Sequence, residues 1–152
     1  MRSKFFRFFI ILTVLAVALL GVVPVTAADK TEFQCTETFI GILDPGTWSF
    51  PDSNIHIRGM VQLLNEDAPD PRVVGENTVE INANFRPDGT GPWWGTWRLE
   101  TDEGGLWVGT AAGQVTEQGT WYNGVGKGIG LYDGMTLFVD MNYGVCNIRI
   151  LE

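Results

Sequence analysis

The chain has 152 residues, of which 45% are hydrophobic and 12% aromatic, and its formal net charge at pH 7 is −8. Its 18 acidic residues outnumber 10 Lys and Arg, and no basic stripe is present to neutralise phosphates, which argues against nucleic acid and anionic membrane surfaces as partners. The negative charge is read as a contribution to solubility.

The first predicted element is a signal peptide over residues 1–27, followed by one domain over residues 28–152. Its positive start consists of Arg2, Lys4 and Arg7. An uncharged apolar run over 8–25 then ends in small residues that a signal peptidase would recognise. An uncleaved membrane anchor is the alternative, because this run is just long enough to span a bilayer.

Cleavage would make the net charge more negative. It removes three of the 10 basic residues and none of the 18 acids, so the mature chain would hold 7 bases against 18 acids, a net charge of −11. We therefore expect a secreted, extracellular or periplasmic protein, with no membrane contact after cleavage.

Cys35 and Cys146 are the two cysteines of the chain. In an exported protein an even count favours one disulfide over two free thiols. The bond would close a loop of about 110 residues, worth about 4–5 kcal/mol in the chain-entropy model. A zinc site would need more ligands, and His56 is the sole histidine. No metal and no cofactor is predicted.

Strand-like runs fill the rest of the chain, and no run shows the spacing of an amphipathic helix. Eight strands are predicted, at residues 33–43, 54–64, 73–85, 93–101, 106–115, 119–130, 135–142 and 145–151. Several alternate between two faces with a period of two, as antiparallel strands over a single core do. The faces assigned to one side are Ile55, Ile57, Gly59, Val61 and Leu63; Val79, Ile81, Ala83 and Phe85; and Trp93, Gly95, Trp97 and Leu99.

Glycines accompany the tryptophans between Gly89 and Gly134. Large rings beside missing side chains suit curved strands, in which a Trp ring covers a neighbouring glycine. Three short connectors have hairpin-turn chemistry, at residues 44–46, 86–89 and 102–105. Residues 66–71 are predicted to be a longer acidic loop. Its Glu66, Asp67 and Asp70 could hold calcium, but they lack the calcium-loop pattern, which favours a solvated loop.

These strands can form an open sandwich or a closed barrel, and the cysteines favour closure. Cys35 falls in the first predicted strand and Cys146 in the last, and a disulfide requires their Cα atoms within about 7 Å. The predicted fold is all-β, an eight-stranded antiparallel up-and-down barrel that is closed or nearly closed and preceded by a signal peptide.

Residues 107–142 contain two glycine-rich motifs, Trp107-Val108-Gly109-Thr110 and Gly128-Ile129-Gly130-Leu131-Tyr132-Asp133-Gly134-Met135, followed by an alternating strand. This segment resembles the C-terminal half of allene oxide cyclase and dirigent barrels of the calycin type. The resemblance implies an eight-stranded barrel with an apolar pocket, often trimeric. The catalytic residues of the plant members have no matching motif here, so none is carried over.

The tryptophans allow two interpretations: they fill the core, or they line a barrel mouth as an aromatic ligand site. The candidate ligand-binding residues are Trp93, Trp97, Trp107, Trp121 and Tyr132. Few catalytic residue types are present, so we expect a non-catalytic secreted barrel. It would bind a small apolar or aromatic-stacking ligand, such as a hydrophobic molecule or a glycan, or a surface partner.

Two alternatives stay open. A cyclase or isomerase acting on a hydrophobic substrate would need a buried ionisable group, with Arg58, Glu80, Arg98 and Tyr132 as candidates. A purely structural extracellular protein would need no cavity. In addition, Trp94 opposes Trp93 and Trp97, and Ile129 and Leu131 oppose a glycine face. One of these faces would meet water in a monomer, which favours a homo-oligomer such as a trimer.

Overall fold

A computed structural model describes residues 29–152 of the chain; the predicted signal peptide lies outside the described residues. This part contains nine strands: β1 (Lys30–Asp44), β2 (Thr47–Ser49), β3 (Ile55–Asp67), β4 (Gly75–Phe85), β5 (Gly91–Thr101), β6 (Leu106–Thr116), β7 (Gly119–Ile129), β8 (Thr136–Asn142) and β9 (Val145–Leu151). Three short 3-10 turns connect them: η1 (Pro51–Ser53), η2 (Pro71–Val73) and η3 (Gly130–Tyr132). Within residues 29–152, no helix is long and apolar enough to cross a membrane.

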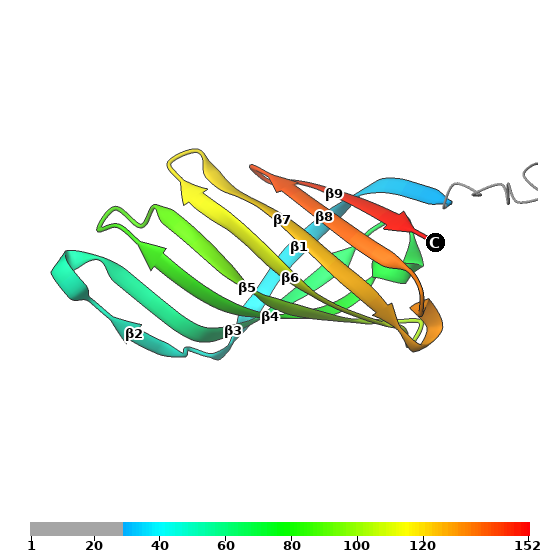
Figure 1. Cartoon of the computed structure of the whole chain (residues 1–152), viewed down its shortest axis with the longest axis horizontal. Helices are drawn as coiled ribbons and strands as arrows, with labels where there is room; N and C mark the ends of the chain where they lie inside the picture. The colour runs from blue at the N-terminus through cyan, green and yellow to red at the C-terminus, as the bar shows by residue number, and fades with distance from the viewer. Residues whose placement is uncertain (1–28) are drawn as a thin grey trace, which may run out of the picture.

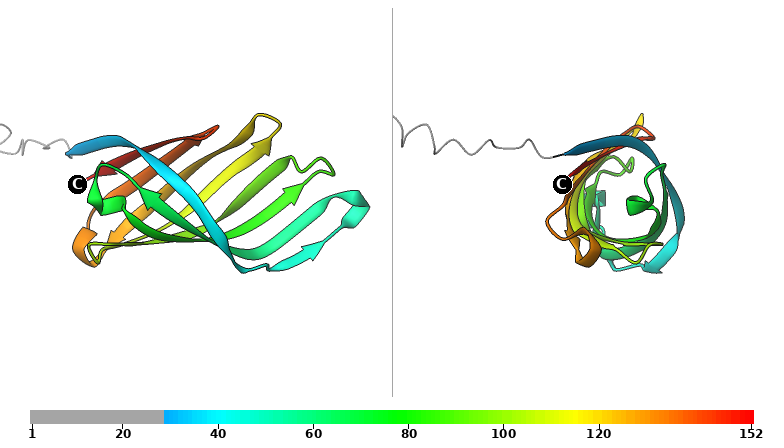
Figure 2. Two further views of the ribbon diagram at one scale, coloured as in Figure 1. Left: turned by 180° about the vertical axis from the view of Figure 1, so that it is seen from behind. Right: turned by 90° about the vertical axis from the view of Figure 1, so that its right-hand side faces the viewer.

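The strands form one antiparallel up-and-down sheet whose hydrogen bonds run in a ring through eight strands. Strand β1 closes this ring by changing partners. Its first half, through Cys35, pairs with β9, and its second half, from Thr36, pairs with β3. β1 accordingly crosses the barrel obliquely in Figure 1, and the ring is seen end-on in the right panel of Figure 2. The predicted barrel is confirmed.

The Cys35–Cys146 disulfide lies where β1 changes partners. The two cysteines face each other across the β1–β9 ladder, with their Cα atoms 5.1 Å apart. They form the last pair of that ladder before Thr36 pairs with Asp67 of β3. The predicted bond is confirmed, and it fixes the seam between the first and last strands of the ring.

One predicted hairpin turn is wrong. Residues 44–46 do not reverse the chain, because β1 and β2 both run antiparallel to β3 and hence in the same direction. The segment is instead a kink, and Gly46 sits in it with a φ of +65° against the backbone of Arg58 and Met60. The reversal comes later, at η1. The predicted turns at 86–89 and 102–105 do form hairpins, linking β4 to β5 and β5 to β6.

The alternation of β3 changes phase at a bulge. The register with β4 shifts between Ile57 and Met60, and Gly59 has a φ of +66°. The face that begins with Ile57 therefore continues through Met60, Gln62, Leu64 and Glu66, and Val61 turns away from the barrel interior. The predicted face of Ile57, Gly59 and Val61 is thus wrong beyond Ile57, because the bulge adds one unpaired residue.

In β4 and β5 the predicted faces are confirmed. Val79, Ala83, Trp93, Trp97 and Leu99 belong to the buried core. The Trp97 ring lies where a Cβ on Gly109 of β6 or on Gly126 of β7 would be placed, and its Nε1 donates to the carbonyl of Thr110 at 3.1 Å. The glycines thus leave room for the tryptophan, as the sequence predicted.

We expect Gly126→Ala to lower the free energy of unfolding by about 1–3 kcal/mol, because its methyl group would force the buried Trp97 ring out of place. Gly41→Ala in β1 is the matched control, since nothing lies within 4 Å of a Cβ at that position. Urea unfolding of both variants measures the effect. Equal losses for the two variants would contradict this account of the Trp97 site.

Candidate functional site

A cavity of about 620 Å³ occupies the interior of the ring. Strands from all around the ring contribute to it, and most of its lining is apolar. Its aromatic residues are Phe39, Phe85, Trp93, Trp97, Tyr122 and Tyr143. Its aliphatic residues are Met60, Leu64, Val79, Ile81, Leu99, Ala111, Val115, Leu137, Val139, Met141 and Ile148. A concave apolar space of this size is typical of small-molecule sites.

One end of the barrel is closed by packed side chains. The Trp107 ring is fully buried, stacks on Tyr132 with a centroid distance of 4.9 Å, and donates from Nε1 to the carbonyl of Arg72 at 2.7 Å. The Tyr132 hydroxyl lies 2.9 Å from the Thr101 hydroxyl oxygen. Val73 of η2 is also fully buried. These contacts hold η2 and η3 over the end at which β3 and β7 finish.

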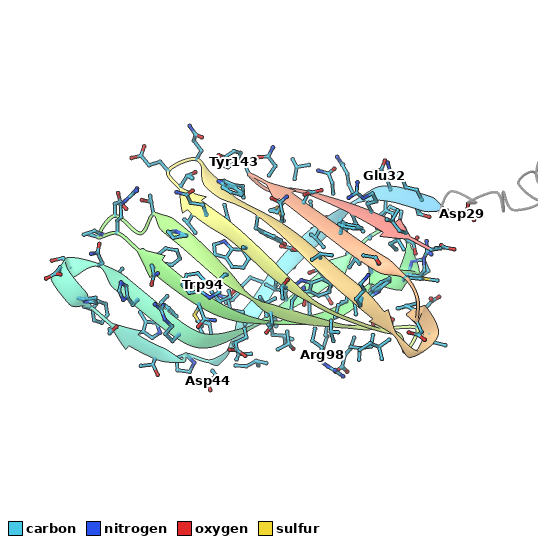
Figure 3. All side chains as sticks on the ribbon, viewed as in Figure 1. Asp29, Glu32, Asp44, Trp94, Arg98 and Tyr143 are labelled. Carbon is cyan, nitrogen blue, oxygen red and sulfur yellow. A yellow bond between two sulfur atoms is a disulfide. The ribbon has the colours of Figure 1, made fainter. Side chains whose placement is uncertain are left out.

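The other end carries the mouth of the cavity. The lining there includes Gln118 and Gly119 at the β6–β7 turn and Tyr143 and Gly144 at the β8–β9 turn. Figure 3 shows Tyr143 at the tip of its turn. Phe39 joins this rim and is 57% exposed. A ligand would therefore reach the cavity between these turns.

A polar cluster interrupts the apolar lining. Glu37 of β1 and Glu66 of β3 lie opposite each other in the β1–β3 ladder. The Tyr122 hydroxyl donates to Oε1 of Glu37, and Nδ2 of Asn77 donates to Oε1 of Glu66 at 2.8 Å. The Tyr122 ring in turn meets Trp93 edge-on, with ring centroids 5.2 Å apart. Four strands thus bring two carboxyl groups, a phenol and an amide together.

Two acceptor atoms of this cluster have no hydrogen-bond partner: Oε2 of Glu66 and Oδ1 of Asn77. Glu66 is 4% exposed and Asn77 is 8% exposed, so bulk water does not readily reach them. Buried polar atoms in proteins are nearly always paired, and an unpaired one calls for an explanation.

Burial governs the protonation of the cluster. It raises the pKa of Glu66 to about 8, helped by the nearby charge of Glu37 and opposed by the hydrogen bond from Asn77. Burial also raises the pKa of Glu37, against the hydrogen bond from Tyr122. The pKa of Tyr122 is raised by burial and by the Glu37 charge. At neutral pH Glu66 is therefore mostly protonated.

The structure separates the five candidate residues named from the sequence. Trp93 and Trp97 line the cavity. Trp107 and Tyr132 stack on each other at the closed end, outside the lining. Trp121 lies on the outward face of β7 and is 37% exposed. The arrangement thus brings two of the five together in the cavity lining.

The sequence predicts none of the polar cavity residues as part of an aromatic or apolar ligand site, although it offers Glu66 as a possible calcium ligand. Glu37 shares a face of β1 with Phe33, Cys35 and Phe39. The inward position of Cys35 could therefore have predicted that Glu37 also points into the barrel. The sequence predicts Glu66 in an acidic loop together with Asp67 and Asp70. Glu66 instead ends the inward face of β3, whereas Asp70 forms an ion pair with Arg72 at 2.7 Å.

Within residues 29–152, no group of three or more His, Cys, Asp or Glu side chains is placed to hold a metal ion. Comparisons of the chain with protein-family models, with curated proteins and with solved structures find no match. What the cavity can bind therefore follows from its own lining.

Proposed function

We propose that the chain is a secreted, non-catalytic binding protein that holds a small apolar ligand inside its barrel. The observation that carries this proposal is the cavity of about 620 Å³, whose lining is mainly aliphatic and aromatic. Burying apolar ligand surface there would supply about 25 cal/mol per Å² of driving force. The deep apolar lining favours a hydrophobic molecule over a glycan.

The resemblance of residues 107–142 to allene oxide cyclase and dirigent barrels supports the proposal, because those barrels have an apolar pocket. In this segment Leu137, Val139 and Met141 of β8 line the cavity, together with Ala111 and Val115 of β6. Membership of that group is part of the proposal.

Ligand binding can be tested with the neutral dye N-phenyl-1-naphthylamine, whose emission rises in apolar surroundings. We expect saturable binding and quenching of tryptophan fluorescence, because Trp93 and Trp97 line the cavity. Ile81→Trp, which adds a bulky ring inside the cavity, should weaken dye binding at least tenfold, a loss of about 1.4 kcal/mol or more.

Ile42→Trp is the matched control, because Ile42 of β1 does not line the cavity and is 51% exposed. It should bind the dye like the wild type, and circular dichroism should show that both variants are folded. A wild-type protein that binds no dye, or an equal loss in both variants, would refute the proposed site.

The enzymatic alternative keeps one supporting observation, the ionisable groups of the cavity: Glu66, which is buried, and Glu37 and Tyr122, which are partly buried. Of the candidates named from the sequence, Glu80 and Arg98 are exposed on the outside, and the Arg58 guanidinium lies 5.3 Å from the outward Trp94 ring. Tyr132 is buried at the closed end. None of the four lines the cavity.

Mass spectrometry of compounds extracted from exported wild-type and Glu66→Gln proteins separates the two functions. A binding protein would carry the same molecular skeleton in both. An enzyme that uses Glu66 as its acid or base would carry product in the wild type and accumulate substrate in the variant.

We also propose that copies of the chain associate, as in the trimers of the resembled barrels. Trp94, Ile129 and Leu131 lie outside the cavity lining, and they are 40%, 45% and 66% exposed. Soluble monomers rarely leave large apolar patches uncovered. Light scattering of the exported protein at micromolar concentration should give a multiple of the monomer mass, and a monomer mass would refute the association.

A further inference from the structure

We infer that the ligand is an amphipathic amine, with an ammonium group bound by Glu66, Asn77 and Glu37 and an apolar body that fills the rest of the barrel. This inference rests on the proposed binding function and adds the chemical class of the ligand. It follows from the polar cluster of the cavity, because a purely apolar ligand would offer that cluster no hydrogen-bond partner.

The first step is the need for a hydrogen-bond donor. Oε2 of Glu66 and Oδ1 of Asn77 are unpartnered, and both side chains are more than nine-tenths buried in the cavity wall. The bond from Nδ2 of Asn77 to Glu66 fixes the amide, so its oxygen is left as an acceptor. When Glu66 is ionised, both atoms are acceptors without a donor, and a buried acceptor left unpaired costs about 1–3 kcal/mol. An ammonium group has three donor hydrogens on one atom and can serve several acceptors at once.

The second step is the sign of the charge. Two carboxyl groups, from Glu37 and Glu66, face each other across β1 and β3, and Tyr122 of β7 and Tyr143 of the β8–β9 turn are the other titratable groups lining the cavity. Among the described residues that line it, there is no Lys, Arg or His. A cation would thus meet its first counter-charges here, while an anionic ligand would be repelled.

The third step is the position of the charge within the cavity. Glu66 is the second-last residue of β3 and Asn77 the third residue of β4. Glu37 lies two residues before the rim residue Phe39 on β1, and its partner Tyr122 is the fourth residue of β7, which begins at the mouth. The ammonium group should therefore sit between Glu37 and the Glu66–Asn77 pair, with the apolar body against the apolar lining.

Binding is then coupled to release of a proton. Because burial keeps Glu66 mostly protonated at neutral pH, an incoming ammonium group would displace its carboxyl proton to solvent and pair with the carboxylate. Amine affinity should therefore rise as the pH increases from about 5 to 8, and affinity for a neutral alcohol should stay constant over that range.

The test compares three ligands with the same chain, octylamine, octanol and octanoate, as competitors of N-phenyl-1-naphthylamine at pH 7. In the wild type, octylamine should compete at least tenfold more strongly than octanol, and octanoate most weakly, because hydrogen bonds to charged groups are the stronger ones. Glu66→Gln should remove the preference for octylamine and leave octanol affinity unchanged. Glu76→Gln, an exposed carboxylate on the same strand β4 as Asn77, is the control for net charge and should behave as the wild type.

The outcomes distinguish the two levels of the proposal. Dye binding with equal competition by octylamine and octanol would overturn the amine inference and leave the apolar site standing. A Glu66→Gln protein that keeps the preference would also overturn it. Absence of dye binding would overturn both. If Glu66→Gln fails to fold, the wild-type pH profile decides, because a flat octylamine affinity between pH 5 and 8 contradicts the coupling.

Discussion

The Glu66→Gln protein should be more stable than the wild type at pH 8, by roughly 2–5 kcal/mol. The pKa of Glu66 is raised from 4.5 to about 8 by burial first and by the Glu37 charge second. Between these two values the folded protein keeps a proton that the unfolded chain has lost. The wild-type free energy of unfolding should therefore fall by about 1.4 kcal/mol for each pH unit across this window.

Urea unfolding at several pH values measures this effect. Below pH 4.5 Glu66 is protonated in both the folded and the unfolded state, so it does not lower the free energy of unfolding there. Above about pH 8 its destabilising effect is complete. Glu37 adds a loss in the same direction, since its pKa is also raised. Asp70 acts oppositely on the acid side, because its hydrogen bonds with Arg72 lower its pKa. Glu76→Gln should retain the wild-type profile. Parallel profiles for the wild type and Glu66→Gln between pH 5 and 8 would contradict the burial of this carboxyl group.

Removing the disulfide with the double change Cys35→Ala and Cys146→Ala should lower the free energy of unfolding by about 2–5 kcal/mol. The bond joins residues 111 positions apart, so its loss greatly increases the conformational entropy of the unfolded chain. It also releases the point at which β1 passes from β9 to β3. Urea unfolding of the oxidised wild type, the reduced wild type and the double variant measures the loss.

The same double variant should still bind N-phenyl-1-naphthylamine at low temperature, because neither cysteine lines the cavity. Alkylation of the wild-type protein without reductant provides the check on the bond itself. Two reactive thiols, or a double variant as stable as the wild type, would show that the seam of the ring does not depend on this bond.

Most of the strand order could be predicted from the sequence, because alternation with a period of two and turn chemistry are local signals. All eight predicted runs correspond to strands of the ring, and the two cysteines correctly pointed to its closure. The short strand β2 was missed. Its three residues follow a proline and glycine that read locally as a hairpin turn, and only pairing with β3 shows that the chain continues in the same direction.

The polar part of the candidate site was harder to predict because it depends on one bulge. The extra residue near Gly59 shifts the inward face of β3, and this shift carries Glu66 into the cavity instead of onto the surface. A glycine inside a strand is a signal for such a bulge. The meeting of Glu37 with Tyr122 spans 85 residues of sequence, and a spacing of that length has no local pattern.

The proposed ligand site requires that an apolar molecule can enter the barrel. A crystal structure of the protein grown with 1-bromooctane tests this directly, because anomalous scattering locates the bromine atom. The predicted result is a bromine peak inside the ring, among the side chains of residues such as Trp97, Leu99 and Leu137. Bromine found only on outer surfaces, such as the exposed side chains of Trp48 and Phe50, would contradict a ligand site within the barrel.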